Sequence, residues 1–183
     1  MKTKTRFISA VILAAICFAG ASSLVNAQTD AAKTSAKPEA VLTAPEATKI
    51  LPSSVFYRGQ SAPTQTRNSG GVRFADGFFV LATLVDNSGY STGIQEKYQA
   101  YFITEVPLDV NGQKLAPGAY GAGFIAGDKF VITDLGAHDL FTVDAGNDAA
   151  MHRPTPLQVK ADSTPQHYRL YAGRKYVTFS RAE

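Results

Sequence analysis

The side chains best suited to metal or acid–base chemistry in this 183-residue chain are its three histidines, His138, His152 and His167. His138 shares a short segment with Asp134 and Asp139, which would offer nitrogen and oxygen ligands to a divalent metal. Aspartate, asparagine and glycine are also the ordinary residues of solvated turns. We favour the turn, and we predict no metal site there.

A second acidic set lies further along the chain. Asp144, Asp148 and His152 are spaced four apart and would share one face of a helix. Gly146 and Asn147 interrupt that helix, because both have poor helix propensity. We again favour a solvated turn, and we predict no metal and no cofactor for the chain.

Nucleophilic chemistry has no clear candidate either. No serine lies in the GxSxG turn that exposes the nucleophile of many hydrolases, and Ser88 is best interpreted as a loop residue. Paired carboxylates for glycoside hydrolysis can come from distant positions, and the sequence marks no pair. We therefore name no catalytic residue, and an envelope hydrolase using Asp, Glu or His stays an alternative.

Two glycines mark a candidate for ligand binding. Gly121 and Gly123 lie two apart, and therefore on one face of a predicted strand, where they leave a strip without side chains. A phosphate-binding loop would need a helix after it, whereas residues 128–133 continue as a strand. Either an aromatic side chain from a neighbouring strand fills the strip or the sheet bends there, which are the commoner arrangements, or the strip is a ligand groove.

Two tyrosines complete the candidate binding residues. Tyr90 and Tyr98 flank residues 91–97, a polar stretch that we interpret as a loop. Tyrosines at the rim of a loop often form binding platforms, although they also end strands for packing reasons alone. We take Tyr90, Tyr98, Gly121 and Gly123 as the candidate ligand-binding residues.

The elements that must position these residues are strands. From Val55 onward, short apolar runs are punctuated by Gly, Pro, Asn and Asp at intervals of roughly eight to twelve residues, which is typical of an all-β domain. Residues 78–85 are apolar on both alternating faces and predict a central strand, entered through a tight turn at 75–77. We predict a single antiparallel β-sandwich or β-barrel of roughly 8–10 short strands.

The N-terminal 50 residues differ from the rest. Residues 1–27 combine a basic start, an apolar run and small residues at Val25 and Ala27, which predicts a secretory signal peptide. Residues 28–50 contain no aromatic side chain and are rich in Ala, Thr, Lys, Glu and Pro, which predicts a disordered tether. The β domain is then expected over residues 51–183.

Removal of the signal peptide would change the bulk properties of the chain. It contains three of the 18 basic residues and none of the 15 acidic ones, so the mature protein would carry 15 of each. It also contains Cys17, the single cysteine, so no disulfide or thiolate site would remain. A neutral chain without a basic cluster predicts no nucleic-acid partner.

One short segment resembles a known family. Residues 110–120, VNGQKLAPGAY, resemble the G-K-x-L-x-x-G-x-Y hairpin of a family of bacterial envelope β-proteins of unknown function, with Gln113 inserted between the glycine and the lysine. The resemblance covers about a dozen residues. It implies a β fold and an envelope location, and it transfers no catalytic residue.

These observations favour an exported protein, periplasmic or extracellular, without a transmembrane segment after signal removal. We expect a non-catalytic β domain that binds an unknown envelope ligand or protein, because binding residues often lie on loops of a rigid scaffold. The alternatives are the envelope hydrolase and a structural or assembly subunit.

Overall fold

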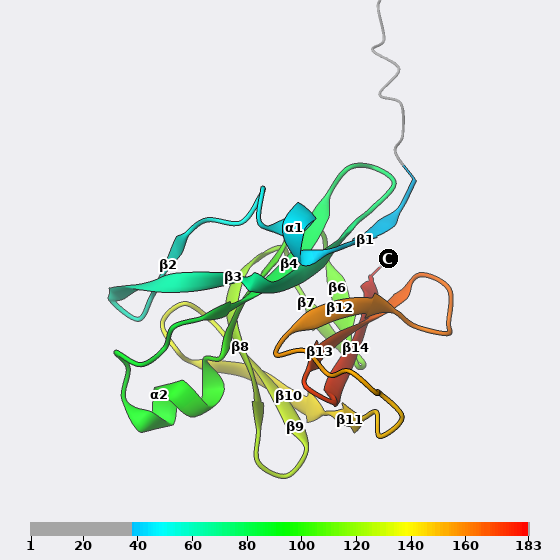
Figure 1. Ribbon diagram of the computed structural model, residues 1–183. Helices are drawn as coiled ribbons and strands as arrows, with labels where there is room; N and C mark the ends of the chain where they lie inside the picture. Colours follow the sequence, from blue (N-terminus) through cyan, green and yellow to red (C-terminus); the bar gives the residue numbers. More distant parts are fainter. Residues whose placement is uncertain (1–37, 183) are drawn as a thin grey trace, which may run out of the picture. The chain divides into compact units, whose positions relative to one another are not determined.

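The computed structural model describes residues 38–182, whose strands form two antiparallel β-sheets (Figure 1). The predicted all-β class is confirmed, and over these residues the two sheets form a sandwich-like arrangement and not a closed barrel. The predicted signal peptide (1–27) and residues 28–37 of the predicted tether lie outside the described residues.

The larger sheet has eight strands in the order β1-β3-β4-β5-β8-β9-β10, and β2 pairs with a second part of the long strand β3. Its strands are β1 (Ala40–Leu42), β2 (Ser54–Tyr57), β3 (Gln60–Arg73), β4 (Phe79–Val85), β5 (Ala100–Thr104), β8 (Gly118–Ile125), β9 (Lys129–Thr133) and β10 (Asp139–Asp144).

The smaller sheet has six strands in the order β12-β13-β14-β6-β7, and β11 pairs with β14. Its strands are β6 (Leu108–Val110), β7 (Gln113–Leu115), β11 (Gly146–Asn147), β12 (Gln158–Ala161), β13 (His167–Ala172) and β14 (Lys175–Arg181). Two short helices, α1 (Ala44–Ala47) and α2 (Thr92–Lys97), lie against the larger sheet.

The predicted central strand is confirmed as β4, which lies between β3 and β5. Successive side chains of a strand point to opposite faces, and here both faces are covered. Val80 points into the sandwich and is fully buried, while Leu81 and Thr83 point outward and are also buried. The predicted turn before it is formed by Gly77, whose φ of +91° suits glycine.

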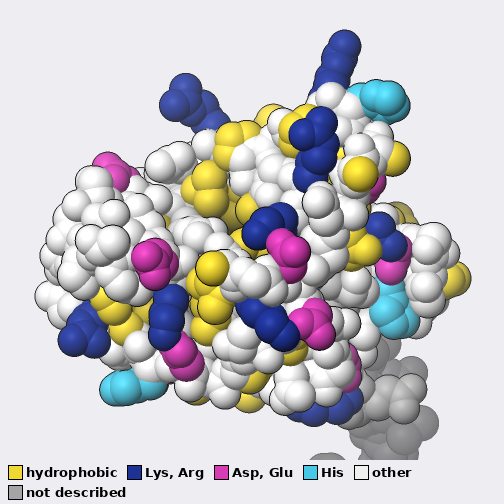
Figure 2. Space-filling view, turned by 90° about the horizontal axis from the view of Figure 1, so that it is seen from below, with side chains coloured by type: hydrophobic (Ala, Val, Ile, Leu, Met, Phe, Trp, Pro, Cys, Tyr) yellow, Lys and Arg dark blue, Asp and Glu magenta, His cyan; other side chains and the backbone are white. Residues whose placement is uncertain are grey.

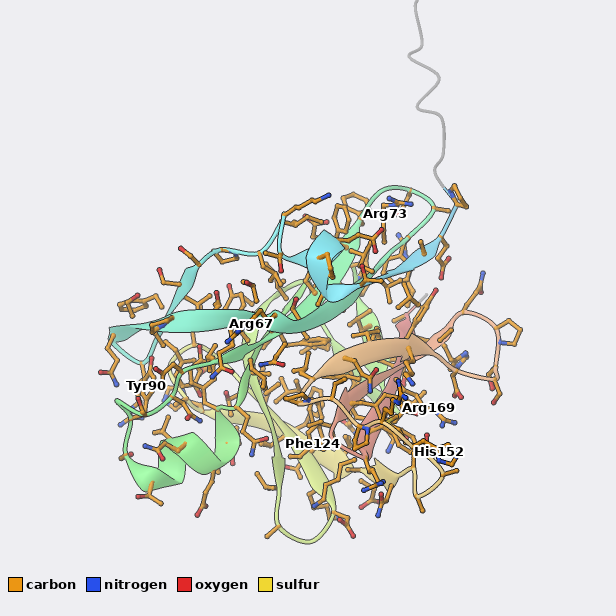
Figure 3. All side chains as sticks on the ribbon, viewed as in Figure 1. Arg67, Arg73, Tyr90, Phe124, His152 and Arg169 are labelled. Atoms are coloured by element: carbon orange, nitrogen blue, oxygen red, sulfur yellow. The ribbon has the colours of Figure 1, made fainter. Side chains whose placement is uncertain are left out.

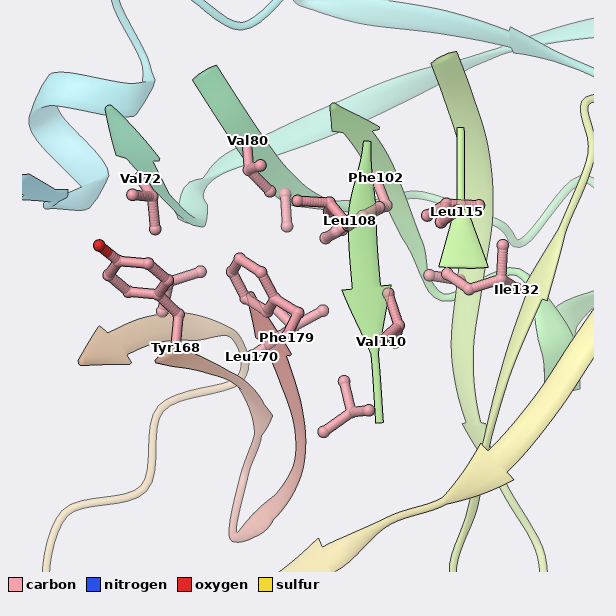
Figure 4. Packing of buried hydrophobic residues seen from close by; sticks show 14 of the residues in the cluster. Val72, Val80, Phe102, Leu108, Val110, Leu115, Ile132, Tyr168, Leu170 and Phe179 are labelled. Carbon is pink, nitrogen blue, oxygen red and sulfur yellow. The ribbon is translucent and has the colours of Figure 1, made fainter. Parts of the chain in front are cut away.

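The main hydrophobic core lies between the two sheets (Figure 4). Val80 and Phe102 of the larger sheet meet Leu108 and Phe179 of the smaller one, and the Phe102 and Phe179 rings pack edge to face with centroids 6.1 Å apart. The alternating apolar positions of all these strands therefore form one continuous core.

The prediction of a disordered tether is wrong for residues 40–50. Leu42, Ala47 and Leu51 bury their side chains against Leu81 on the outer face of the larger sheet. Pro45 stands in the first turn of α1, where its missing N–H is tolerated, so it begins the helix and does not prevent it. Small apolar side chains suffice for burial here because Leu81 already supplies an apolar partner.

Residues 110–120 carry the chain from the smaller sheet to the larger one. Asn111 and Gly112 form the predicted turn between β6 and β7, with φ values of +46° and +88°. After β7 the chain enters β8, where the Tyr120 hydroxyl donates a hydrogen bond of 2.8 Å to the Ala116 carbonyl. The Tyr120 ring lies over Gly118, so a methyl group there would meet the end of the tyrosine side chain 2.8 Å away. These contacts give the segment a structural role.

Candidate functional site

The glycine strip that sequence reasoning offered as a ligand groove is filled. A methyl group on Gly121 would lie 2.5 Å from the Thr133 hydroxyl and 3.0 Å from the Tyr98 ring. A methyl group on Gly123 would collide with the Lys97 carbonyl at the end of α2. The ligand groove is therefore not formed. Aromatic side chains cover Gly121, as expected, but they come from β2 and the end of α2, and the backbone of α2 covers Gly123.

The predicted tyrosine platform is wrong, because both tyrosines are buried. Tyr98 has no exposed surface and Tyr90 has 7%. With Tyr57 they form a cluster, the tyrosine cluster, in which Tyr57 and Tyr98 stack with ring centroids 3.7 Å apart and Tyr90 packs edge-on against both. Residues 92–97 form helix α2 where a loop was expected, and this cluster lies between the helix, β2 and the sheet.

Burial dominates the electrostatics of the tyrosine cluster. It raises the pKa of Tyr57, Tyr90 and Tyr98, most strongly for Tyr98, so all three phenols are neutral at pH 7. The Tyr57 hydroxyl lies 2.7 Å from the Thr133 hydroxyl, and the Tyr90 hydroxyl donates to the Tyr57 carbonyl. The Tyr98 hydroxyl is buried without a partner. The structure thus brings together Tyr90, Tyr98 and Gly121, as part of the protein interior.

The two acidic sets lie at the two ends of β10 and in the irregular segments beside it: Asp139 and Asp144 begin and end the strand, and only the other members lie in turns or loops. His138 bonds to Asp134 through Nδ1, at 2.9 Å, whereas Asp139 forms an ion pair with Lys97. His152 lies in the irregular segment that follows β11 (Figure 3), which is not helical. Within residues 38–182 no three His, Cys, Asp or Glu side chains are grouped so that they could hold a metal ion.

A different surface, the outer face of the smaller sheet, is hollowed. Three adjoining hollows of about 460, 520 and 260 Å³ follow β14 from Arg181 to Tyr176. The first two share His167, Ser180 and Arg181, and the last two share Asn111 and Thr178. We call this surface the β14 groove. The five residue steps between Tyr176 and Arg181 correspond to about 17 Å of strand.

A row of polar side chains crosses the middle of the β14 groove. The strand registers place His167 opposite Ser180, Ser180 opposite Asp109, and Asp109 opposite Lys114, on four neighbouring strands. Their neighbours Tyr168, Phe179 and Val110 belong to the core, so the row points outward. Directly opposed side chains on neighbouring strands have Cβ atoms about 5 Å apart. Donor and acceptor groups therefore lie at close, regular intervals along the row.

Local hydrogen bonds orient the members of this row. His167 Nδ1 lies 3.0 Å from the Pro165 carbonyl oxygen, which can only accept, so in the neutral ring Nδ1 carries the proton and Nε2 is an acceptor. Asp109 Oδ1 accepts from the Gly112 N–H at 2.7 Å, and its other oxygen lies 3.7 Å from Lys114 Nζ. His167, Asp109 and Ser180 are half-buried, as expected of side chains in a shallow hollow.

Charged networks border the groove on two sides. At one end Arg181 binds Asp76, and this hydrogen bond lowers the pKa of the Asp76 carboxyl, so Asp76 is ionised at pH 7. On β13, Arg169 forms an ion pair of 2.6 Å with Asp162 and lies over the Tyr176 ring, 4.4 Å from its centroid. Figure 3 shows Arg169 and Tyr90 on opposite sides of the molecule, so the groove and the tyrosine cluster are separate.

The charge on the described surface is mixed. On the face seen in Figure 2, basic and acidic side chains are interspersed, with small hydrophobic areas between them. This agrees with the equal numbers of acidic and basic residues after residue 27. In residues 38–182 no helix is long and apolar enough to cross a membrane.

Sequence reasoning missed the β14 groove, although one indication of it is present. Both β13 and β14 alternate polar with apolar side chains, with His167, Arg169, Thr178 and Ser180 on the polar positions. The alternation predicts an outward polar face. It does not reveal that Asp109, about seventy residues earlier, joins the same row.

Comparison with known proteins yields no matching family model, no curated protein with a similar sequence and no solved structure with a similar fold.

Proposed function

We propose that this chain is an exported, non-catalytic binding protein of the cell envelope, and that the β14 groove holds a hydroxyl-rich linear ligand such as a segment of an envelope polysaccharide. The observation that carries the proposal is the cross-strand row of His167, Ser180, Asp109 and Lys114 in an elongated hollow. A linear ligand suits a hollow that is several residues long and open along its length.

The chemistry of the row fits sugar hydroxyls. Each hydroxyl both donates and accepts, so a surface that binds many of them needs both kinds of group close together. Asp109 accepts, Lys114 donates, and the hydroxyls of Ser180 and Thr178 do both. The rigid sheet holds these groups in place before the ligand arrives, which reduces the entropy lost on binding.

The geometry gives less support to the hydrolase alternative. A serine relay needs the histidine between the serine and the carboxylate. In this row Ser180 lies between His167 and Asp109. Glycoside hydrolysis needs one carboxylic acid and one carboxylate on the two sides of the bound sugar, and the row contains a single carboxyl group, that of Asp109. Binding without turnover is therefore the better-supported function.

The binding proposal is tested with the mature chain and a panel of bacterial envelope oligosaccharides. We expect at least one to bind and to shift the backbone amide resonances of β6, β13 and β14. Ser180→Tyr would fill the groove and abolish that binding, while Ser88→Tyr, at an exposed loop position, would leave it unchanged. Binding that survives Ser180→Tyr, or shifts confined to other strands, contradicts the proposal, and so does turnover of a bound oligosaccharide.

The export proposal is tested separately, because it depends on residues 1–27 alone. We expect the protein expressed in a bacterial host to lose these residues and to begin at Gln28, as measured by intact mass. Ala27→Arg should block the cleavage, because small residues are needed there. An unprocessed chain in the cytoplasm contradicts the export proposal and leaves the binding proposal standing.

A further inference from the structure

The outer face of the larger sheet has a small uncovered cleft. One part of this face is covered by α1 and Leu42, Ala47 and Leu51, and another part by the tyrosine cluster. Between them remains a cleft of about 150 Å³, which we call the α1 cleft. Its lining includes Ile50, Phe79, Leu81, Tyr101, Ile103 and Glu105.

The walls of the α1 cleft are almost entirely apolar. Phe79 and Ile103, on neighbouring strands, are partly exposed there, and Ile50 leaves 47% of its surface in solvent. Burial raises the pKa of Tyr101, so its ring contributes no charge at pH 7. The volume is comparable to cavities that hold one benzene-sized ring. An apolar group that entered the cleft would therefore bury its own surface and cover exposed protein side chains.

One lining residue carries a charge. Glu105 lies at the end of β5, where its carboxylate accepts the Phe79 N–H at 2.8 Å and its own N–H donates to the Phe79 carbonyl at 2.9 Å. No ion pair of residues 38–182 includes Glu105. Arg73 occupies the same cross-strand row beyond Phe79, and its guanidinium donates to the Pro38 carbonyl. The apolar wall thus ends at the Glu105 carboxylate, which is held by a backbone hydrogen bond and has no ion-pair partner within residues 38–182.

We infer that the α1 cleft is a second binding site and that its ligand is a small organic cation with an apolar body, such as an arylalkyl ammonium ion. The apolar body occupies the space between Ile50, Phe79 and Ile103, and the ammonium group lies against Glu105. The Tyr101 ring lines the other end of the cleft and adds apolar surface for the body of the ligand. This inference does not rest on the β14 groove, which lies on the other sheet.

The test uses three probes that share a phenyl ring and differ in charge, namely phenethylammonium, 2-phenylethanol and phenylacetate. We expect phenethylammonium to bind the mature chain most tightly and phenylacetate least, with an advantage over the alcohol of about two- to fivefold from the exposed ion pair. Binding should shift the amide resonances of Phe79 and Ile103.

Two variants test separately the contribution of the Glu105 charge and that of the open cleft. Glu105→Gln keeps an oxygen that can accept from the Phe79 N–H, and it should remove the preference for the cation while 2-phenylethanol still binds. Ile103→Trp should fill the cleft and abolish binding of both, and Leu140→Trp, at a position 47% exposed on β10, is the matched control. Thermal unfolding verifies that each variant is folded.

The inference is overturned if phenethylammonium and 2-phenylethanol bind the unaltered protein equally, if neither binds, or if the preference survives Glu105→Gln. Ser180→Tyr should leave phenethylammonium binding unchanged. Loss of oligosaccharide binding alone would therefore count against the proposed function and not against the α1 cleft.

Discussion

The Tyr98 ring stacks on the Tyr57 ring, with centroids 3.7 Å apart and planes inclined by 11°, and both rings lie against the backbone of Gly121. The stack holds the C-terminal end of segment 91–97 against the larger sheet and covers the part of its outer face around Gly121. The strip at Gly121 and Gly123, which the sequence offers as a possible ligand groove, is thereby part of the protein interior.

This arrangement predicts that Gly121→Ala is strongly destabilising. The added methyl group would overlap Thr133 Oγ1 and both tyrosine rings, and overpacking of a buried site costs about 1–3 kcal/mol of unfolding free energy. Urea denaturation measures this change. Gly93→Ala is the control, because its methyl group would meet no atom within 4 Å and alanine favours α2. Equal stability of the two variants would show that the stack does not press on Gly121.

The two stacked tyrosines should respond differently to loss of the hydroxyl. Tyr57→Phe removes the bond to Thr133 and leaves that buried hydroxyl without its partner, so we expect a loss of about 1–2 kcal/mol. Tyr98→Phe removes a buried hydroxyl that has no partner, so we expect unchanged or slightly higher stability. Chemical denaturation of both variants measures the difference, and a larger loss for Tyr98→Phe would contradict it.

Stability should fall at alkaline pH. The folded-state pKa values of Tyr57, Tyr90 and Tyr98 are raised above the ordinary value of 10, so the folded protein keeps these protons where the unfolded chain releases them. The stabilisation is complete below about pH 10 and is lost as the pH rises through the folded-state values. Tyrosinate absorbance should therefore show part of the phenols ionising together with unfolding. Independent titration of all tyrosines near pH 10 in a folded protein would exclude this coupling.

Because Leu51 packs with Leu42, Ala47 and Leu81, we expect its side chain to contribute to the free energy of unfolding. Leu51→Ala should cost about 2 kcal/mol of unfolding free energy, because it opens the cluster over Leu81. Its neighbour Ile50 is 47% exposed, so Ile50→Ala should change the value by no more than about 0.5 kcal/mol. Thermal or urea unfolding compares the pair. If Leu51→Ala left the free energy of unfolding unchanged, residues 40–51 would not be packed against the sheet as the structure shows.

Several elements follow from local sequence patterns. Phe79–Val85 is apolar on both alternating faces and is a buried central strand, and Asn111 and Gly112 form the turn that their tolerance of positive φ predicts. The tether prediction fails because composition alone underestimates how much apolar surface the segment can bury. Leu42 and Ala47 are few and small, but they pack against an apolar face already present on β4. The export signal stays a prediction from residues 1–27.

By itself, the amino-acid sequence determined the all-β class, the main turns and the alternation of buried and exposed positions, because these depend on backbone preferences within a few residues. Only the tertiary structure decided which faces are open. Gly121 is covered because residues 57 and 98 converge on it, and Ser180 joins Asp109 because β14 pairs with β6. Strand order and register are set by packing between segments far apart in the chain, and local patterns contain no information on such partners.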